Sequence, residues 1–106
     1  MITNLTQENF NSQVAKAPGT HVIRFWASWC KPCTMAQPIF MKVAQAMQAE
    51  AHFAEVNIDT QPDLARRFGI RSIPTVVVAK DGEAVDGSMG VVDQGTLKAL
   101  VKRHLD

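Results

Sequence analysis

The chain has two cysteines, Cys30 and Cys33, which stand three residues apart. They follow an apolar segment and open a stretch with helical periodicity. A cysteine in the first turn of a helix lies beside unpaired backbone N–H groups and the positive end of the helix dipole. Both features favour the thiolate over the thiol, and the thiolate is the reactive form. The pair is therefore predicted to be a dithiol that attacks a disulfide and completes the exchange with its second sulfur.

The order of the two sulfurs predicts different roles for them. Cys30 precedes the helix, where the dipole acts most strongly and solvent has access, so it is the expected nucleophile. Cys33 lies one turn in and is the expected resolving thiol, which attacks Cys30 in the mixed disulfide. Lys31 adds a positive charge between them, and Pro32 suits a helix start because its missing N–H donor costs little there.

A structural disulfide and a zinc site are the alternative interpretations of the cysteine pair. Zinc would need a second pair of ligands, which is absent from the sequence. Neither a metal nor another cofactor is therefore expected.

Size and composition limit the classes of protein to which the chain could belong. Its 106 residues suit a single domain, 1–106, and 46% of them are hydrophobic, which is enough to bury a core. The net charge of +1 argues against a nucleic-acid partner. No apolar run approaches the roughly 20 residues of a membrane helix, and the first residues lack the pattern of a signal peptide. We therefore expect a cytoplasmic monomer with no membrane partner.

Apolar periodicity and turn residues predict alternating strands and helices. Strands are expected at residues 2–5, 21–27, 52–58, 74–79 and 84–89, with a hairpin turn at 80–83 between the last two. Helices are expected at residues 6–17 with Thr6 as cap, at 33–49, from Thr60 as cap to Gly69, and from Asp93 as cap onward. This order predicts an α/β fold with a central mixed five-stranded sheet flanked by four helices. The five methionines are expected to fill its core.

Several motifs in order along the chain resemble those of the thioredoxin family. They are the cysteine segment 25–33, followed by Met35, Pro38 and Ile39, and then segments 56–59, 68–75 and 80–82 and Gly90. The resemblance covers nearly the whole chain and implies the thioredoxin fold. It also implies thiol-disulfide oxidoreductase activity on protein disulfides, with a thioredoxin reductase as electron donor.

The resemblance also implies a substrate surface around the cysteines. Pro74 resembles the cis-proline of the family, and a cis bond there would aim the Ile73 backbone at the cysteines, where an extended substrate segment could pair with it. Trp29, Gly90 and Val91 would complete an apolar rim. Ordinary packing is the alternative role for Trp29, and a simple turn is the alternative for Gly90.

The chain departs from the family at two charged positions. Most thioredoxins carry an aspartate where this chain has Arg24, and a lysine where it has Glu55. Arg24 interrupts an apolar run, and an unpaired buried charge costs several kcal/mol, so we predict an Arg24–Glu55 ion pair beneath the cysteines. The alternative is that the Arg24 side chain reaches out to solvent.

The exchanged charges predict altered redox chemistry. A fixed cation near the sulfurs favours thiolate, which lowers the pKa of Cys30 and makes the disulfide a stronger oxidant. Arginine cannot act as a base near neutral pH, so resolution of the mixed disulfide by Cys33 is expected to be slow. Two other functions stay open: a binding module of the same fold that has lost the exchange reaction, and a glutathione-dependent glutaredoxin.

Overall fold

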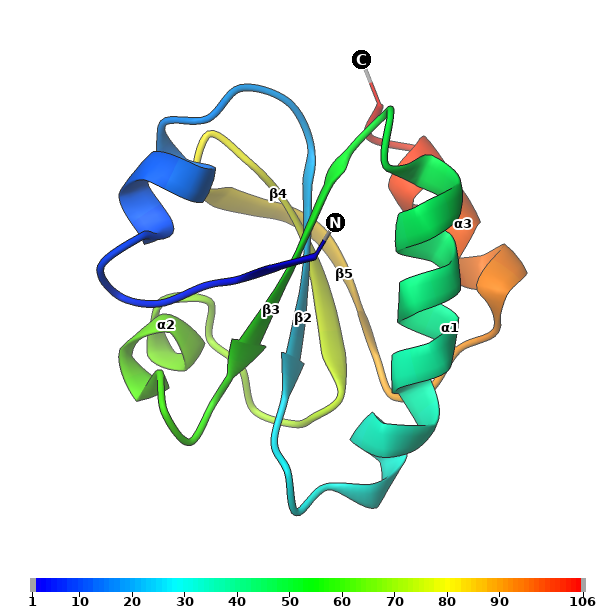
Figure 1. Ribbon diagram of the computed structural model, residues 1–106, viewed down its shortest axis with the longest axis horizontal. Coiled ribbons are helices and arrows are strands. Elements are labelled where there is room, and N and C mark those ends of the chain that lie inside the picture. Colours follow the sequence, from blue (N-terminus) through cyan, green and yellow to red (C-terminus); the bar gives the residue numbers. More distant parts are fainter. Residues whose placement is uncertain (1, 106) are drawn as a thin grey trace.

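A five-stranded mixed sheet forms the centre of the computed structural model, which describes residues 2–105 (Figure 1). The strands are β1 (Ile2–Asn4), β2 (His21–Trp26), β3 (His52–Asn57), β4 (Thr75–Lys80) and β5 (Glu83–Met89). Their order in the sheet is β1-β3-β2-β4-β5. The first three run parallel, whereas β4 is antiparallel to both β2 and β5. β2 is therefore the central strand, as its nearly continuous apolar sequence indicates.

Helices cover both faces of the sheet (Figure 1). The helix α1 (Lys31–Met47) and the helix α3 (Gln94–Lys102) lie on one face, and the π-helix η1 (Asn11–Ala15) and the helix α2 (Pro62–Arg67) lie on the other. The predicted architecture, a mixed five-stranded sheet flanked by four helices, is confirmed.

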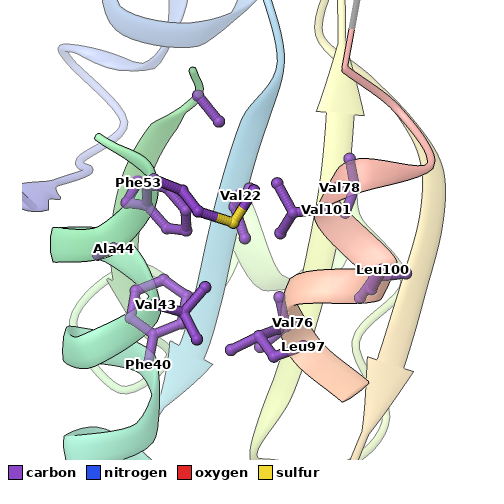
Figure 2. Close-up of a cluster of buried hydrophobic side chains, with 12 residues drawn as sticks. Val22, Phe40, Val43, Ala44, Phe53, Val76, Val78, Leu97, Leu100 and Val101 are labelled. Atoms are coloured by element: carbon purple, nitrogen blue, oxygen red, sulfur yellow. The ribbon is translucent and has the colours of Figure 1, made fainter. Parts of the chain in front are cut away.

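Alternate residues of β2 supply both halves of the core. Val22 packs with Phe40 and Val43 of α1 and with Leu100 of α3 (Figure 2). Ile23 and Phe25 face the other way, toward the cluster that includes Phe10, Val14 and Leu64. Because side chains alternate along a strand, Arg24 lies on the same face as Val22, which is the face that α1 covers.

The first helix is shorter than predicted. Thr6 accepts a hydrogen bond from the Asn9 N–H (3.2 Å), and the Asn9 side chain accepts one from the Thr6 N–H (2.8 Å). This reciprocal pair closes a turn, and the regular element begins only at Asn11. The Lys16 N–H then donates to the Asn11 carbonyl (2.8 Å), a five-residue step that makes the element a π-helix.

The predicted cap of α2 is wrong. Gln61 occupies the N-cap position without a side-chain hydrogen bond, and Pro62 begins the helix. The Thr60 hydroxyl instead donates to the Asn57 carbonyl (3.3 Å), which closes the turn after β3. Proline in the first turn starts α2 without a polar cap because its φ angle is already helical.

The hairpin turn between β4 and β5 and the cap of α3 are both as predicted. Asp81 and Gly82 both have positive φ angles, 54° and 80°, which is the two-residue hairpin geometry. Asp93 caps α3, because its carboxylate accepts a hydrogen bond from the Thr96 N–H (2.8 Å).

The methionines only partly fill the core. Met47 is buried, but Met35, Met41 and Met89 are exposed. Met1 lies outside the described residues. The prediction that the methionines fill the core is therefore wrong for three of the four described ones. Two of these lie on the outer face of α1, and the third lies at the end of β5.

Candidate active site

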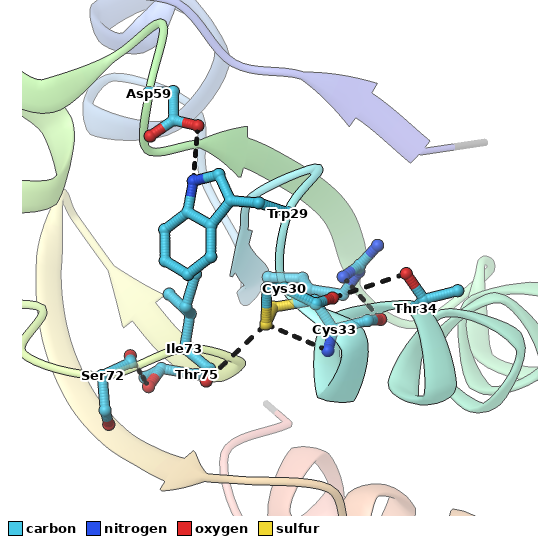
Figure 3. The surroundings of a disulfide bond; sticks show 9 residues. Trp29, Cys30, Cys33, Thr34, Asp59, Ser72, Ile73 and Thr75 are labelled. Carbon is cyan, nitrogen blue, oxygen red and sulfur yellow. Dashed lines mark hydrogen bonds between the residues drawn. A yellow bond between two sulfur atoms is a disulfide. The ribbon is translucent and has the colours of Figure 1, made fainter.

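A disulfide joins Cys30 and Cys33 at the start of α1 (Figure 3). The chain leaves the central strand β2 at Trp26, turns through 27–29 and enters the helix. Cys30 is the N-cap residue, and its sulfur accepts a hydrogen bond from the Cys33 N–H (3.2 Å). The sulfur therefore occupies the place at which a helix stabilises negative charge.

The two cysteines differ in depth. Cys30 keeps 5% of its surface exposed and Cys33 keeps 1%. Lys31 and Pro32 are exposed in the first turn of α1, and that turn holds no acidic residue. Cys30 is thus the outer sulfur, and no side-chain carboxylate of the first turn offsets the positive end of the helix.

The loop before β4 faces the disulfide. The Ile73–Pro74 peptide bond is cis, and the Ile73 carbonyl oxygen lies 3.9 Å from the Cys30 sulfur (Figure 3). Pro74 is buried, and its carbonyl accepts a hydrogen bond from the Gly90 N–H (2.8 Å). These contacts bring the loop before β4 and the turn after β5 together beside Cys30.

Exposed apolar side chains lie around this opening. Trp29 is 67% exposed, and its indole N–H donates to the Asp59 carboxylate (2.8 Å), which fixes the ring beside the disulfide (Figure 3). Val91 is also exposed. Gly90 has φ +84°, and no atom lies within 4 Å of where a Cβ would stand. The left-handed backbone therefore accounts for glycine at this position, and the surface in front of it is open.

Two residues of this region were not singled out from the sequence. Met89 is 74% exposed and pairs in register with Thr75, directly after Pro74. Asp59 holds Trp29. Their places next to Gly90 and at the end of the 56–59 motif were the available signals.

Arg24 and Glu55 form an ion pair beneath the active site. They are register partners on β2 and β3, and the Arg24 Nε lies 2.9 Å from the Glu55 Oε2. The Arg24 side chain is 3% exposed, so it does not reach solvent, while that of Glu55 is 15% exposed. The charged pair therefore lies within the protein, with its acid nearer the surface.

Arg24 also contacts the active-site helix. Its Nη1 donates to the Cys33 carbonyl at a long distance of 3.4 Å, and its guanidinium carbon lies 5.6 Å from the centre of the Trp26 ring. The cation is thus held between the central strand and the first turn of α1. Trp26 is partly buried and packs against the cluster of Ala27, Cys30 and Cys33, and its indole nitrogen is a buried side-chain atom without a hydrogen-bond partner among the described residues.

Residues 2–105 lack the features of two other kinds of site. No group of three or more His, Cys, Asp or Glu side chains in this range could hold a metal ion. No helix in the same range is long and apolar enough to cross a membrane.

Comparison with known proteins identifies the family. The thioredoxin family model matches residues 1–103. The chain is 35% identical to a thioredoxin of Rickettsia bellii over 105 residues, which cover 99% of this chain and 100% of the relative. It is 37% identical to thioredoxin 1 of Synechococcus elongatus over 101 residues, 95% of this chain and 94% of the relative. It is 36% identical over 104 residues, 98% of this chain, to the chloroplastic thioredoxin M4 of Arabidopsis thaliana, and spans 54% of that protein's length.

The matches and the geometry agree. The family model extends over the whole sheet and its helices, and the cysteine pair lies at the start of the helix that follows the central strand. The chain therefore belongs to the thioredoxin family and is a thiol-disulfide oxidoreductase.

Proposed function

We propose that the protein exchanges its Cys30–Cys33 dithiol with disulfides of other proteins. The main support for this proposal is the position of the two sulfurs. Cys30 is the outer one at the start of α1, and Cys33 lies behind it. The Cys30 thiolate attacks one substrate sulfur, the substrate S–S bond breaks, and the other sulfur leaves as a thiolate that takes up a proton. Cys33 then loses its proton and attacks Cys30, which releases the second substrate thiolate. Two electrons pass to the substrate, and the protein is left with its disulfide.

The substrate segment would lie on the rim formed by Trp29, Ile73, Pro74, Gly90 and Val91. The Ile73 carbonyl, which lies 3.9 Å from the Cys30 sulfur, supports this role, because an extended chain can pair with such a backbone segment as a strand adds to a sheet edge. The exposed Trp29 and Val91 side chains would cover the apolar part of the bound segment.

The Arg24–Glu55 pair would tune the sulfurs. Arg24 is the member of the pair that contacts the Cys33 backbone, so its charge acts on the dithiol at shorter range than the charge of Glu55. A nearby cation stabilises the thiolate form and hence the reduced protein. Each ~1.4 kcal/mol of that stabilisation raises the two-electron potential by about 30 mV. Lys31 acts in the same direction, so the protein would be more oxidising than a thioredoxin with the usual buried aspartate.

The protein would have one partner besides its substrates. A thioredoxin reductase would return electrons to the disulfide, and the chain would act as a single domain and a monomer. Two cysteines are too few for a structural disulfide framework, which supports a reducing compartment such as the cytoplasm.

Insulin reduction with dithiothreitol as electron source tests the central claim. The wild-type protein should accelerate insulin precipitation, and Cys30→Ser should lower the rate to that of dithiothreitol alone. Cys33→Ser should retain the first attack and accumulate a mixed disulfide with an insulin chain, visible on a non-reducing gel. A wild-type rate equal to that of dithiothreitol alone would instead favour a binding module without exchange.

A further inference from the structure

Negative charge is missing from the segments that meet at the disulfide. Residues 25–49, 64–80 and 87–92 contain no Asp or Glu, although the whole chain has ten such residues and a net charge of only +1. These segments contribute the first turn of α1, the loop before β4 and the turn after β5, which the contacts of Cys30, Ile73 and Gly90 bring together.

Two exposed cations belong to the segments that meet at the reacting sulfur. Lys31 follows Cys30 directly, and Arg71 stands two residues before Ile73. Two residues of extended chain span at most about 7 Å, and the Ile73 carbonyl is 3.9 Å from the Cys30 sulfur. A substrate segment that pairs with the Ile73 backbone therefore passes close to both cations.

The nearby charges of the protein leave these two cations available. Arg24 is paired with Glu55. The Asp59 carboxylate accepts a hydrogen bond from the Trp29 indole, and the Asp93 carboxylate accepts one from the Thr96 N–H, so neither is engaged with these cations. Among residues 2–105 no carboxylate forms an ion pair with Lys31 or Arg71.

We propose that Lys31 and Arg71 select protein disulfides in which the attacked cysteine has an acidic side chain within about three residues along an extended chain. This inference rests on the proposed exchange reaction and adds the class of substrate. Charges at the rim of an interface mainly raise the association rate and are screened by salt. An exposed ion pair is weak, so each cation should change the rate by about 1.5- to 5-fold.

Three synthetic peptides test the proposal with the full-length, reduced protein. Each peptide forms one intramolecular disulfide, and the three differ only in the residue beside one cysteine, which is Glu, Gln or Lys. The second-order rate at which each peptide oxidises the protein is measured at low salt and at 1 M salt. The neighbouring residue also alters the intrinsic reactivity of the peptide, so each rate is divided by that of the same peptide with dithiothreitol.

The normalised rate should be highest for the Glu peptide and lowest for the Lys peptide at low salt, and the difference should shrink at 1 M salt. Lys31→Gln combined with Arg71→Gln should bring the ratio of the Glu and Lys rates close to one. The ratio is the decisive quantity, because a change in Cys30 reactivity caused by Lys31→Gln alters all three rates alike. Lys42→Gln, which removes an exposed cation from the middle of α1, should leave the ratio unchanged.

Other results would overturn the inference. Equal normalised rates, or a ratio that survives the double substitution, would show that these cations do not select the substrate. If the rate depended on these cations with glutathione disulfide but not with the peptides, the cations would instead recognise a small-molecule disulfide. If the Gln peptide still oxidises the protein, the exchange reaction stands in each of these cases. If none of the peptides oxidises it, the exchange reaction fails as well.

Discussion

Arg24 shows what one buried charge imposes on its surroundings. Its side chain is 3% exposed, and it reaches one carboxylate and one backbone carbonyl. The need for a partner could be predicted because a charged residue interrupts an apolar strand and desolvation of a lone charge is costly. The contact with the Cys33 carbonyl could not be predicted, because it depends on how closely α1 packs over β2.

Substitutions at the two ends of this pair should shift the sulfurs in opposite directions. Arg24→Ala removes the cation near Cys33, so the Cys30 pKa should rise by about half a unit to one unit, less than for a charge in direct contact. The potential should become more negative by about 15–30 mV. Glu55→Gln leaves the cation unneutralised and should lower the Cys30 pKa. The thiolate absorbance at 240 nm against pH, with a glutathione-buffer titration of the potential, measures both.

An unchanged or lower Cys30 pKa in Arg24→Ala would refute the tuning role. Both variants should also be less stable, since each leaves a charge without its partner. For Arg24→Ala the loss should be about 3 kcal/mol, the lower end for a broken buried pair, because Glu55 lies nearer the surface.

The ends of the secondary-structure elements show which local signals decide structure. Asp93 caps α3 as predicted, since its carboxylate accepts a hydrogen bond from the Thr96 N–H. The Thr60 hydroxyl bonds back to Asn57 instead of capping α2, and Thr6 closes a turn instead of an α-helix. Ser and Thr side chains can satisfy several nearby backbone groups, so the residue type does not reveal which group they satisfy.

The hairpin turn gives a test at the scale of elements. Gly82 has φ +80°, and a Cβ there would lie 3.2 Å from the Ala15 Cα and Cβ of η1, whereas Gly69 has φ +64° with no atom within 4 Å. Gly69→Ala should therefore show backbone strain alone, about 1 kcal/mol. Gly82→Ala should lose about 2 kcal/mol or more, because η1 must also move. Urea unfolding of both variants measures the difference, and equal losses would mean that η1 does not restrict the hairpin.

At the scale of the whole molecule, the end of β2 opposite the disulfide holds a stacked histidine pair, in which His21 is buried and His52 is exposed. The His21 ring stacks on the His52 ring with centres 4.7 Å apart, and its Nε2 lies 3.0 Å from the Ala17 carbonyl. Burial, the largest cause, lowers the pKa of His21 from its ordinary value of 6.5. The folded protein therefore binds this proton less readily than the unfolded chain does.

Stability should consequently fall as the pH drops below about 6.5. In that range the unfolded chain takes up a proton that folded His21 refuses, so the free energy of unfolding decreases toward the pKa of the folded state. His21→Gln should flatten the decrease between pH 7 and pH 5, a window above the ordinary pKa of the carboxylates. Urea titrations at several pH values measure the slope, and an identical slope in both proteins would exclude His21 as the cause.

The strand order could largely be predicted, because a buried apolar strand and a two-residue hairpin turn identify β2, β4 and β5. The distribution of charge over the surface could not be predicted. A net charge of +1 argues against a nucleic-acid partner, yet it averages over a surface on which the segments near the disulfide carry no acid. The resemblance predicts a rim that includes Ile73 and Gly90 beside the cysteines, but only the folded chain shows which charges lie near the opening where these residues meet.

The unequal depth of the two cysteines bears on which sulfur of the disulfide is attacked. Cys33 is 1% exposed and Cys30 is 5% exposed, so we expect an incoming thiolate to attack the Cys30 sulfur. Displacement at sulfur expels the partner on the far side, and here that leaving group stays inside the protein, next to the backbone that Arg24 contacts. The fold is therefore expected to select the attacked sulfur by its accessibility, and the selection should be the same for any reductant.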